Sequence, residues 1–182
     1  MKKKIRVYLR AFEIDDYIKI HQWRQDKEIS RNFGGVPLFS SSLNEKKWVE
    51  DRIFDKNNVS CAICLKETHD FIGCIFLNDI DLHNRTGHIP IFIGEKDFLG
   101  KGYATDARVL MLKYAFFDRG LNRIWARVLE DNVGALKMLE KTGYKKEGKL
   151  RQANFKNSQY LDEYLLAVLK LDFEKVLDQY EL

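Results

Sequence analysis

Two glycines stand close together at a point where the chain could bind an anion. Gly100 and Gly102 lie between an apolar stretch at residues 89–93 and an amphipathic stretch at 103–118, a pattern that predicts a strand, a short loop and a helix. Backbone amides at the start of a helix bind phosphate groups when glycines remove the side-chain bulk, with the helix dipole behind them. The sequence therefore predicts a phosphate-binding loop, and a plain strand-to-helix turn is the competing interpretation.

The spacing of this loop excludes the two best-known phosphate loops. Thr105 stands where the dinucleotide-binding fingerprint needs its third glycine, and Lys101 is not followed by Ser or Thr as the nucleoside triphosphate loop requires. The predicted loop therefore belongs to neither of these types.

A second segment follows residues 123–129, which read as a strand. It begins with Asn132, whose side chain can cap a helix, and it ends at Gly143, a residue type that commonly terminates one. Leu136 and Leu139 recur between them at helical spacing. Taken alone, this segment is explained equally well by an ordinary capped helix with its lysines in solvent.

Taken in order, the two segments resemble motifs of the GNAT superfamily of acyl-CoA-dependent N-acetyltransferases. The family's phosphate loop reads Gln/Arg-x-x-Gly-x-Gly/Ala, and a later signature reads Asn-x-x-Ala followed by Lys-x-Gly-Phe/Tyr. Residues 147–152 and 160–162 also resemble the branch that holds ribosomal-protein N-terminal, spermidine and amino-sugar acetyltransferases. The matching residues are Leu99, Gly100, Lys101, Gly102, Tyr103 and Ala104 in the loop, and Asn132, Ala135, Lys141, Gly143 and Tyr144 in the later signature.

The resemblance implies an acetyltransferase that uses acetyl-CoA as co-substrate and no metal. The amides of residues 100–105 would hold the pyrophosphate, and the edge of strand 91–93 would hydrogen-bond the pantetheine arm. Asn132 would hydrogen-bond the pantetheine or help orient the thioester, and a backbone amide at Ile91 or Phe92 would donate to the oxyanion. The implied cofactor-binding residues are Ile91, Phe92, Ile93, Leu99, Gly100, Lys101, Gly102, Tyr103, Ala104, Thr105, Asn132 and Lys141.

The catalytic positions depart from the family pattern. Leu139 stands where spermidine-type enzymes carry a tyrosine that acts as general acid, and Ala135 and Asn154 stand where ribosomal-protein serine-type enzymes carry the Ser and Glu of the acid and base roles. His88 can relay a proton near neutral pH and is the best candidate base. A structural histidine is the competing interpretation, and deprotonation through water alone remains open.

The acceptor side of the family is built from the N-terminal helix and loop. The candidates here are Trp23, Glu28, Arg31 and Asn32, for which ordinary packing and surface charge are the competing explanations. Acidic and basic residues alternate in this region, so the sequence shows no acidic pocket for a polyamine. An amino sugar or a peptide amine fits at least as well.

Two alternatives from other classes remain open. The first is a non-catalytic acyl-CoA-binding module of the same fold, because the family's acid and base are missing. The second is nucleic-acid binding through residues 137–151, which hold six basic and two acidic side chains. Nucleic-acid binding would depend strongly on salt and would compete with CoA.

The rest of the chain supplies the elements that position these residues. With 182 residues, 45% apolar and 32% charged, the chain predicts one domain over residues 1–182. Residues 59–65 and 71–77 predict a hairpin, and strands alternate with helices in the second half. We expect an α/β (α+β) fold with a mixed central sheet of about six to seven strands flanked by about four helices.

Local signals place some boundaries more closely. Ser42 and Glu45 form a capping box, which predicts a helix that starts there and turns Phe54 inward. Residues 160–171 predict the last strand.

Composition also bounds the environment of the protein. No apolar run approaches the roughly 20 residues of a membrane-spanning helix, no export signal follows the basic start, and three cysteines favour a reducing compartment. Cys61 and Cys64 lack a second pair at zinc spacing and are expected in the core. We expect a cytoplasmic protein whose partner is a small-molecule or peptide amine, with no membrane or nucleic-acid partner, and a homodimer is left open.

Overall fold

The computed structural model describes residues 2–30, 40–156 and 158–181. The helices are α1 (Asp16–Gln25), α2 (Lys27–Ser30), α3 (Ser42–Phe54), α4 (Tyr103–Lys113), α5 (Val133–Lys141) and α6 (Lys170–Leu177), with two short turns η1 (Lys96–Phe98) and η2 (Tyr114–Asp118). The strands are β1 (Lys3–Lys4), β2 (Val7–Ala11), β3 (Val59–Leu65), β4 (Phe71–Asp81), β5 (Thr86–His88), β6 (Ile91–Ile93), β7 (Arg123–Leu129), β8 (Lys145–Lys156), β9 (Gln159–Leu169) and β10 (Tyr180–Glu181).

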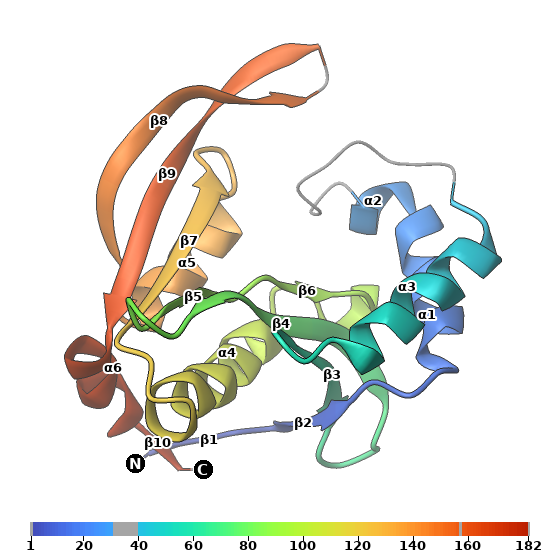
Figure 1. The fold of residues 1–182 in the computed structure, drawn as a ribbon, viewed down its shortest axis with the longest axis horizontal. Helices are drawn as coiled ribbons and strands as arrows, with labels where there is room; N and C mark the ends of the chain where they lie inside the picture. The colour runs from blue at the N-terminus through green and yellow to red at the C-terminus, as the bar shows by residue number, and fades with distance from the viewer. Residues whose placement is uncertain (1, 31–39, 157, 182) are drawn as a thin grey trace.

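Eight of these strands form one mixed sheet (Figure 1). Its order is β2-β3-β4-β5-β7-β9-β8, and β6 pairs with β4 beside β5. The neighbours are antiparallel except β5 and β7, which run parallel. A parallel pair needs a long crossover connection, and the segment that contains α4 supplies it. The predicted hairpin of β3 and β4 and the predicted mixed sheet are both found.

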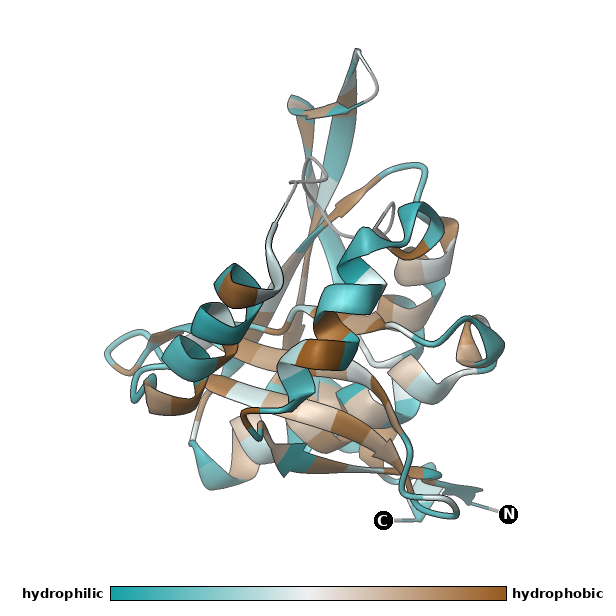
Figure 2. Ribbon diagram, turned by 90° about the vertical axis from the view of Figure 1, so that its right-hand side faces the viewer, coloured by the Kyte–Doolittle hydropathy of each residue, from teal (hydrophilic) through white to brown (hydrophobic). Residues whose placement is uncertain are grey.

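Two apolar cores lie on opposite faces of this sheet. One core includes Ile75, Leu112 and Leu139, and it is covered by α4, α5 and α6. The other includes Ile20 and Val49 and is covered by α1 and α3. The second core holds no residue of β7, β8 or β9, so α1 and α3 cover only the first half of the sheet. Figure 2 shows hydrophobic residues gathered in the central strands between these layers.

The helix α3 differs in detail from the sequence-based expectation. Its cap is Ser41, whose Oγ accepts a hydrogen bond from the Asn44 amide at 3.2 Å. Glu45 does not complete a capping box, because its buried carboxylate pairs with Arg24 at 3.1 Å. The prediction that Phe54 faces inward is wrong, and 74% of this residue is exposed. Phe54 stands five residues after the buried Val49, which turns it about 140° away from the sheet.

The C-terminal part of the chain also departs from the expectation. Strand β9 ends at Leu169, and α6 follows, with Phe173 buried against the α4 side of the sheet. The chain then returns as β10, which pairs in parallel with β1 through Lys3 and Tyr180. Strand β8 is longer than predicted, and β8 and β9 project from the body as an arm (Figure 1). No described helix is long and apolar enough to cross a membrane.

The two cysteines of the Cys-x-x-Cys pair face opposite sides of β3. Cys61 packs against the α4-side core, and Cys64 belongs to the core beneath α1 and α3. Burial raises the pKa of the Cys61 thiol to about 11. Both thiols are therefore packing groups, as the sequence predicts.

Candidate active site

The sheet splits where β5 gives way to β6. Strand β5 pairs with β7 as far as His88 and Trp125, whereas β6 pairs with β4 and has no described strand along its other edge. Pro90 stands at the split, and a proline has no amide with which to continue a strand ladder. The stretch predicted as a strand, residues 89–93, therefore holds the split and β6, while β5 ends just before it. We call the gap between Ile91–Ile93 and residues 126–129 the wedge.

The register shows which backbone groups face the wedge. The Gly94 amide donates to the Ile72 carbonyl of β4 at 2.9 Å. Successive residues of a strand direct their amides and carbonyls to alternate edges, so Phe92 also faces β4, and Ile91 and Ile93 face the wedge. An extended ligand can hydrogen-bond such an edge as an added strand. Of the two amides predicted for the oxyanion, the Ile91 amide is the one on the wedge side.

The glycine loop lies beside the wedge and has an open backbone. Gly100 and Gly102 have φ angles of +70° and +86°, in the left-handed region. A Cβ atom at Gly100 would meet no atom within 4 Å. Helix α4 starts at Tyr103, and Gly102 as its N-cap offers no side chain to the amides of the first turn. These amides therefore suit a phosphate group.

A buried carboxylate supports the glycine loop through an arginine that contacts the loop backbone. Asp106 is fully buried and pairs with Arg6 and Lys3, each at 2.7 Å. Arg6 also donates to the carbonyl of Lys101 at 3.1 Å, and its guanidinium lies 4.2 Å from the centre of the Tyr103 ring. Sequence reasoning missed this support, because about 100 residues separate the partners and no local pattern links them.

His88 lies at the closed end of the wedge, on the face that α1 and α3 leave open. Its ring stacks on Trp125, with ring centres 4.3 Å apart, and its Nδ1 is 3.8 Å from Asp79. Burial, assisted by the charge of Arg108, lowers the pKa of His88 to about 4. At neutral pH the ring is uncharged and can accept a proton, but it is a weaker base than a solvated histidine. Its role as base stays a prediction.

A carboxylate that sequence reasoning did not single out shares this face. Glu163 of β9 is 8% exposed and pairs with Arg127 of β7 at 2.6 Å. Asn154 of β8 donates to the same carboxylate at 3.2 Å. Glu163 thus stands on the strand next to Asn154, the position for which the resemblance implies a glutamate in ribosomal-protein serine-type enzymes. Glu163 could not be identified from the sequence because the register between neighbouring strands cannot be derived from the local sequence.

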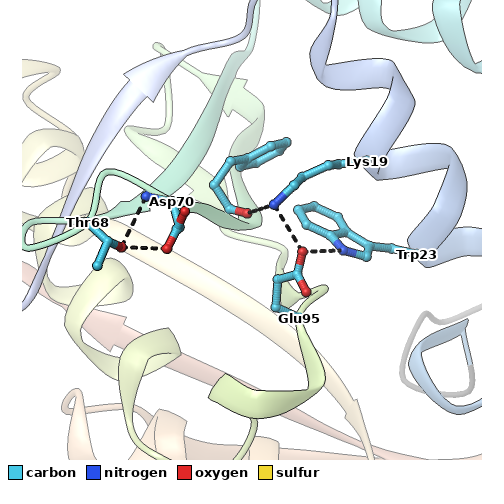
Figure 3. Close-up of polar contacts among 6 residues, drawn as sticks. Lys19, Trp23, Thr68, Asp70 and Glu95 are labelled. Carbon is cyan, nitrogen blue, oxygen red and sulfur yellow. Dashed lines mark hydrogen bonds and ion pairs between the residues drawn. The ribbon is translucent and has the colours of Figure 1, made fainter.

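Trp23 joins α1 to β6. It is 5% exposed and packs edge to face against Phe71 and Phe92. Its Nε1 donates to Glu95 at 3.4 Å, and Lys19 reaches the same oxygen at 3.1 Å (Figure 3). Trp23 therefore fixes the acceptor-side helix next to the wedge by packing.

The carboxylate of Glu28 forms an ion pair with a lysine of the same chain. Lys96, which precedes the glycine loop, lies 2.8 Å from both Glu28 and Asp26. Arg31 and Asn32, the other two acceptor-side candidates, lie outside the described residues.

Asn132 caps α5 as its sequence position suggests. Its Oδ1 accepts a hydrogen bond from the Ala135 amide at 3.1 Å, which leaves its Nδ2 as the group that could reach a ligand. Leu139, on the same helix, is 1% exposed within the core. No proton donor therefore stands at that position.

The basic segment of the sequence does not form one continuous patch. Lys145 pairs with Asp172 at 2.8 Å, and Lys149 pairs with Glu130 at 2.7 Å and Asp162 at 2.9 Å. Lys141, on exposed α5, forms no ion pair within the described part of the chain. Lys145 and Lys149 of β8 are thus neutralised by carboxylates of the protein itself, whereas Lys141 of α5 is available to an anionic ligand.

Comparisons with known proteins agree with this geometry. A family model described as "Acetyltransferase (GNAT) domain" matches residues 6–145. The "Uncharacterized N-acetyltransferase p20" of Bacillus licheniformis is 28% identical over 170 residues, covering 92% of this chain and 95% of that protein. The spermidine N(1)-acetyltransferase of Vibrio cholerae is 25% identical over 162 residues, covering 89% of this chain and 92% of that protein.

A solved structure shares the fold. The spermidine N-acetyltransferase from Vibrio cholerae, crystallised in complex with CoA and spermine, superimposes with a TM-score of 0.84 at 24% identity, over 93% of this chain and 98% of that one. The predicted α/β fold is thereby confirmed.

Proposed function

Because this chain belongs to the GNAT acetyltransferase family, we propose that it transfers the acetyl group of acetyl-CoA to a primary amine, which attacks directly in a ternary complex. The observation that carries the proposal is the edge of β6 along which no described strand pairs, with Ile91 and Ile93 facing the wedge beside an open glycine loop. A phosphate group and an extended pantetheine arm need these two features side by side.

The chain's own groups suit acetyl-CoA. The amides of residues 100–105 hold the pyrophosphate, with Lys141 of α5 as a further cation. Ile91 and Ile93 hydrogen-bond the pantetheine arm, and Asn132 orients it through Nδ2. Bound acetyl-CoA supplies an activated thioester carbonyl. The Ile91 amide polarises the carbonyl oxygen, as donors of an oxyanion hole do.

The amine approaches on the face that carries His88, Trp125 and Arg127. This face is open because α1 and α3 cover only the first half of the sheet. His88 is uncharged at neutral pH and takes the proton that the attacking amine must lose, with water carrying that proton onward. Glu163 is paired with Arg127 at 2.6 Å, and its buried carboxylate offers the amine a hydrogen-bond acceptor.

The charges near the acceptor side favour an amine with one positive charge over a polyamine. The Vibrio cholerae relative was crystallised with spermine, and binding a polyamine needs several unpaired acids. Here four acids of the N-terminal helices and their ends are already paired with cations of the chain. We therefore propose an amino sugar or a peptide amine as acceptor. The pairs are Asp16 with Arg10, Glu45 with Arg24, and Asp26 and Glu28 with Lys96.

A thiol-release assay tests the function directly. Acetyl-CoA is offered with panels of amino sugars, short peptides with free N-termini, and polyamines, and released CoA is measured against the hydrolysis background. We expect release with an amino sugar or a peptide and little with polyamines. Release that is fastest with spermidine or spermine would contradict the proposed acceptor class and leave the reaction type intact.

The second candidate is a non-catalytic acyl-CoA-binding module. It is favoured by the apolar Leu139, buried where spermidine-type relatives carry their acid. Calorimetric CoA binding without thiol release for any amine would support it. Gly102→Ala should weaken CoA binding at least about tenfold, because alanine is strained at a φ of +86°. Gly134→Ala is the matched control, since its new Cβ would approach only the Asn132 side chain, at 3.9 Å.

A further inference from the structure

Arg108 of α4 is a buried guanidinium without a carboxylate partner among the described residues. Only 3% of the residue is exposed. Its Nη2 donates to the Ile89 carbonyl and its Nη1 to the Tyr144 hydroxyl, each at 3.0 Å, and its Nε has no hydrogen-bond partner. Burying a cation without an opposite charge costs folding free energy. The presence of Arg108 therefore points to a negative charge that forms nearby during function.

The positive charge of Arg108 lies beneath the closed end of the wedge. Ile89 directly precedes Pro90, where the sheet splits. Ile91 follows two residues later, a distance of about 7 Å along an extended chain. Tyr144 stands at the start of β8, on the other side of the split. A single guanidinium therefore joins the β6 side to the β8 side beneath the wedge.

The other ionisable groups around the wedge do not neutralise the positive charge of Arg108. Arg127 and Glu163 neutralise each other at 2.6 Å on the opposite face. Asp79 has 63% of its side chain exposed to solvent, which screens its charge. His88 is uncharged at neutral pH, partly because of Arg108 itself. The field of Arg108 therefore reaches the closed end of the wedge.

We propose that the buried charge of Arg108 stabilises the thiolate that leaves when the acetyl group is transferred. This inference rests on the proposed function. In the transfer, a bond forms between the amine nitrogen and the carbonyl carbon, and the carbon–sulfur bond breaks with its electron pair going to sulfur. The surplus proton of the amine passes through His88 to water. Leu139 cannot protonate the sulfur, so a fixed positive field takes the place of a proton donor.

The unmodified protein gives the first test. The thiolate of CoA absorbs in the ultraviolet, so the thiol of bound CoA can be titrated in the binary complex and compared with free CoA. We expect the pKa of the bound thiol to be lower by about one unit or more. By linkage, CoA should bind more tightly as pH rises through this interval, and desulfo-CoA should not.

Three variants separate charge from packing. Arg108→Met removes the charge at similar volume, Arg108→Lys retains it, and Tyr144→Phe removes one hydrogen bond while leaving the guanidinium. We expect the bound thiol to regain its free pKa in Arg108→Met and to stay shifted in the other two. Turnover should fall about tenfold or more in Arg108→Met, with a smaller loss in Tyr144→Phe.

The outcomes are distinct. A bound thiol with an unshifted pKa in the unmodified protein overturns the inference, whether or not the variants fold. An equal loss of the shift in Tyr144→Phe and Arg108→Met also overturns it, because Arg108 would then act through packing alone. Failure to bind CoA at all would refute the proposed function itself.

Discussion

At the scale of single residues, the site depends on groups whose chemistry is set by their neighbours. The histidine of the sequence-based hypothesis, His88, is buried against Trp125 and lies near the charge of Arg108, which together make it a weak base. Glu163 is fixed by Arg127 and Asn154. None of these relations can be predicted from the local sequence, because each joins residues on different strands or helices.

The lowered pKa of His88 predicts a pH-dependent stability. Its pKa is about 4 in the folded chain and about 6.5 in an unfolded one, so the unfolded state binds the proton first. The free energy of unfolding should therefore fall as pH drops from about 6.5 to about 4, by about 2 kcal/mol at pH 5. Urea titrations of the wild type and His88→Gln should differ in this window and converge above it.

The same variant tests the role of His88 as base. His88→Gln should lower turnover by about 100-fold with CoA affinity intact. An unchanged rate would assign deprotonation to water alone.

Glu163 should matter for the amine and not for the cofactor. Glu163→Gln removes the buried negative charge, and we expect the KM for the amine to rise about tenfold with CoA affinity unchanged. Glu147→Gln is the matched control, because Glu147 forms a comparable pair with Arg123 at 2.6 Å on an exposed surface. An equal effect in both variants would argue against a role for Glu163 in binding the amine.

At the scale of elements, the sequence predicted those with strong local signals. The hairpin of β3 and β4, β7 and the loop before α4 appear where apolar runs and glycines placed them. The split at Pro90 was missed because an apolar run carries no sign of which strand will pair with it. Helix α6 was missed because Leu169 and Leu171 flank Lys170, an alternation that is typical of a strand.

The contact between α1 and β6 yields a prediction about packing. A Cβ atom at Gly94 would lie 2.0 Å from the Trp23 ring, so Gly94→Ala should push α1 away from β6. We expect a loss of about 2 kcal/mol or more in the free energy of unfolding, measured by urea denaturation. Gly134→Ala should change stability little, since its Cβ would have space.

At the scale of the whole molecule, the net charge of +4 has a different meaning from the one that composition suggests. The basic segment is divided between α5 and β8, and Lys145 and Lys149 of β8 are paired with carboxylates. Basic residues that are divided between two elements suit the few negative charges of a bound cofactor better than the long phosphate backbone of a nucleic acid. The homodimer and the cytoplasmic location stay predictions, and sedimentation equilibrium would test the first.

The pairing of β1 with β10 places the two ends of the described chain side by side (Figure 1). A linker of about six residues could join them, and new ends could be opened in the exposed turn at residues 82–85. We expect such a circular permutant to fold and to bind CoA like the natural chain, as measured by circular dichroism and calorimetry. Its failure would show that β4 and β5 must be joined covalently for the wedge to form. Its success would mean that the sequence order of these elements can be rearranged without losing the site.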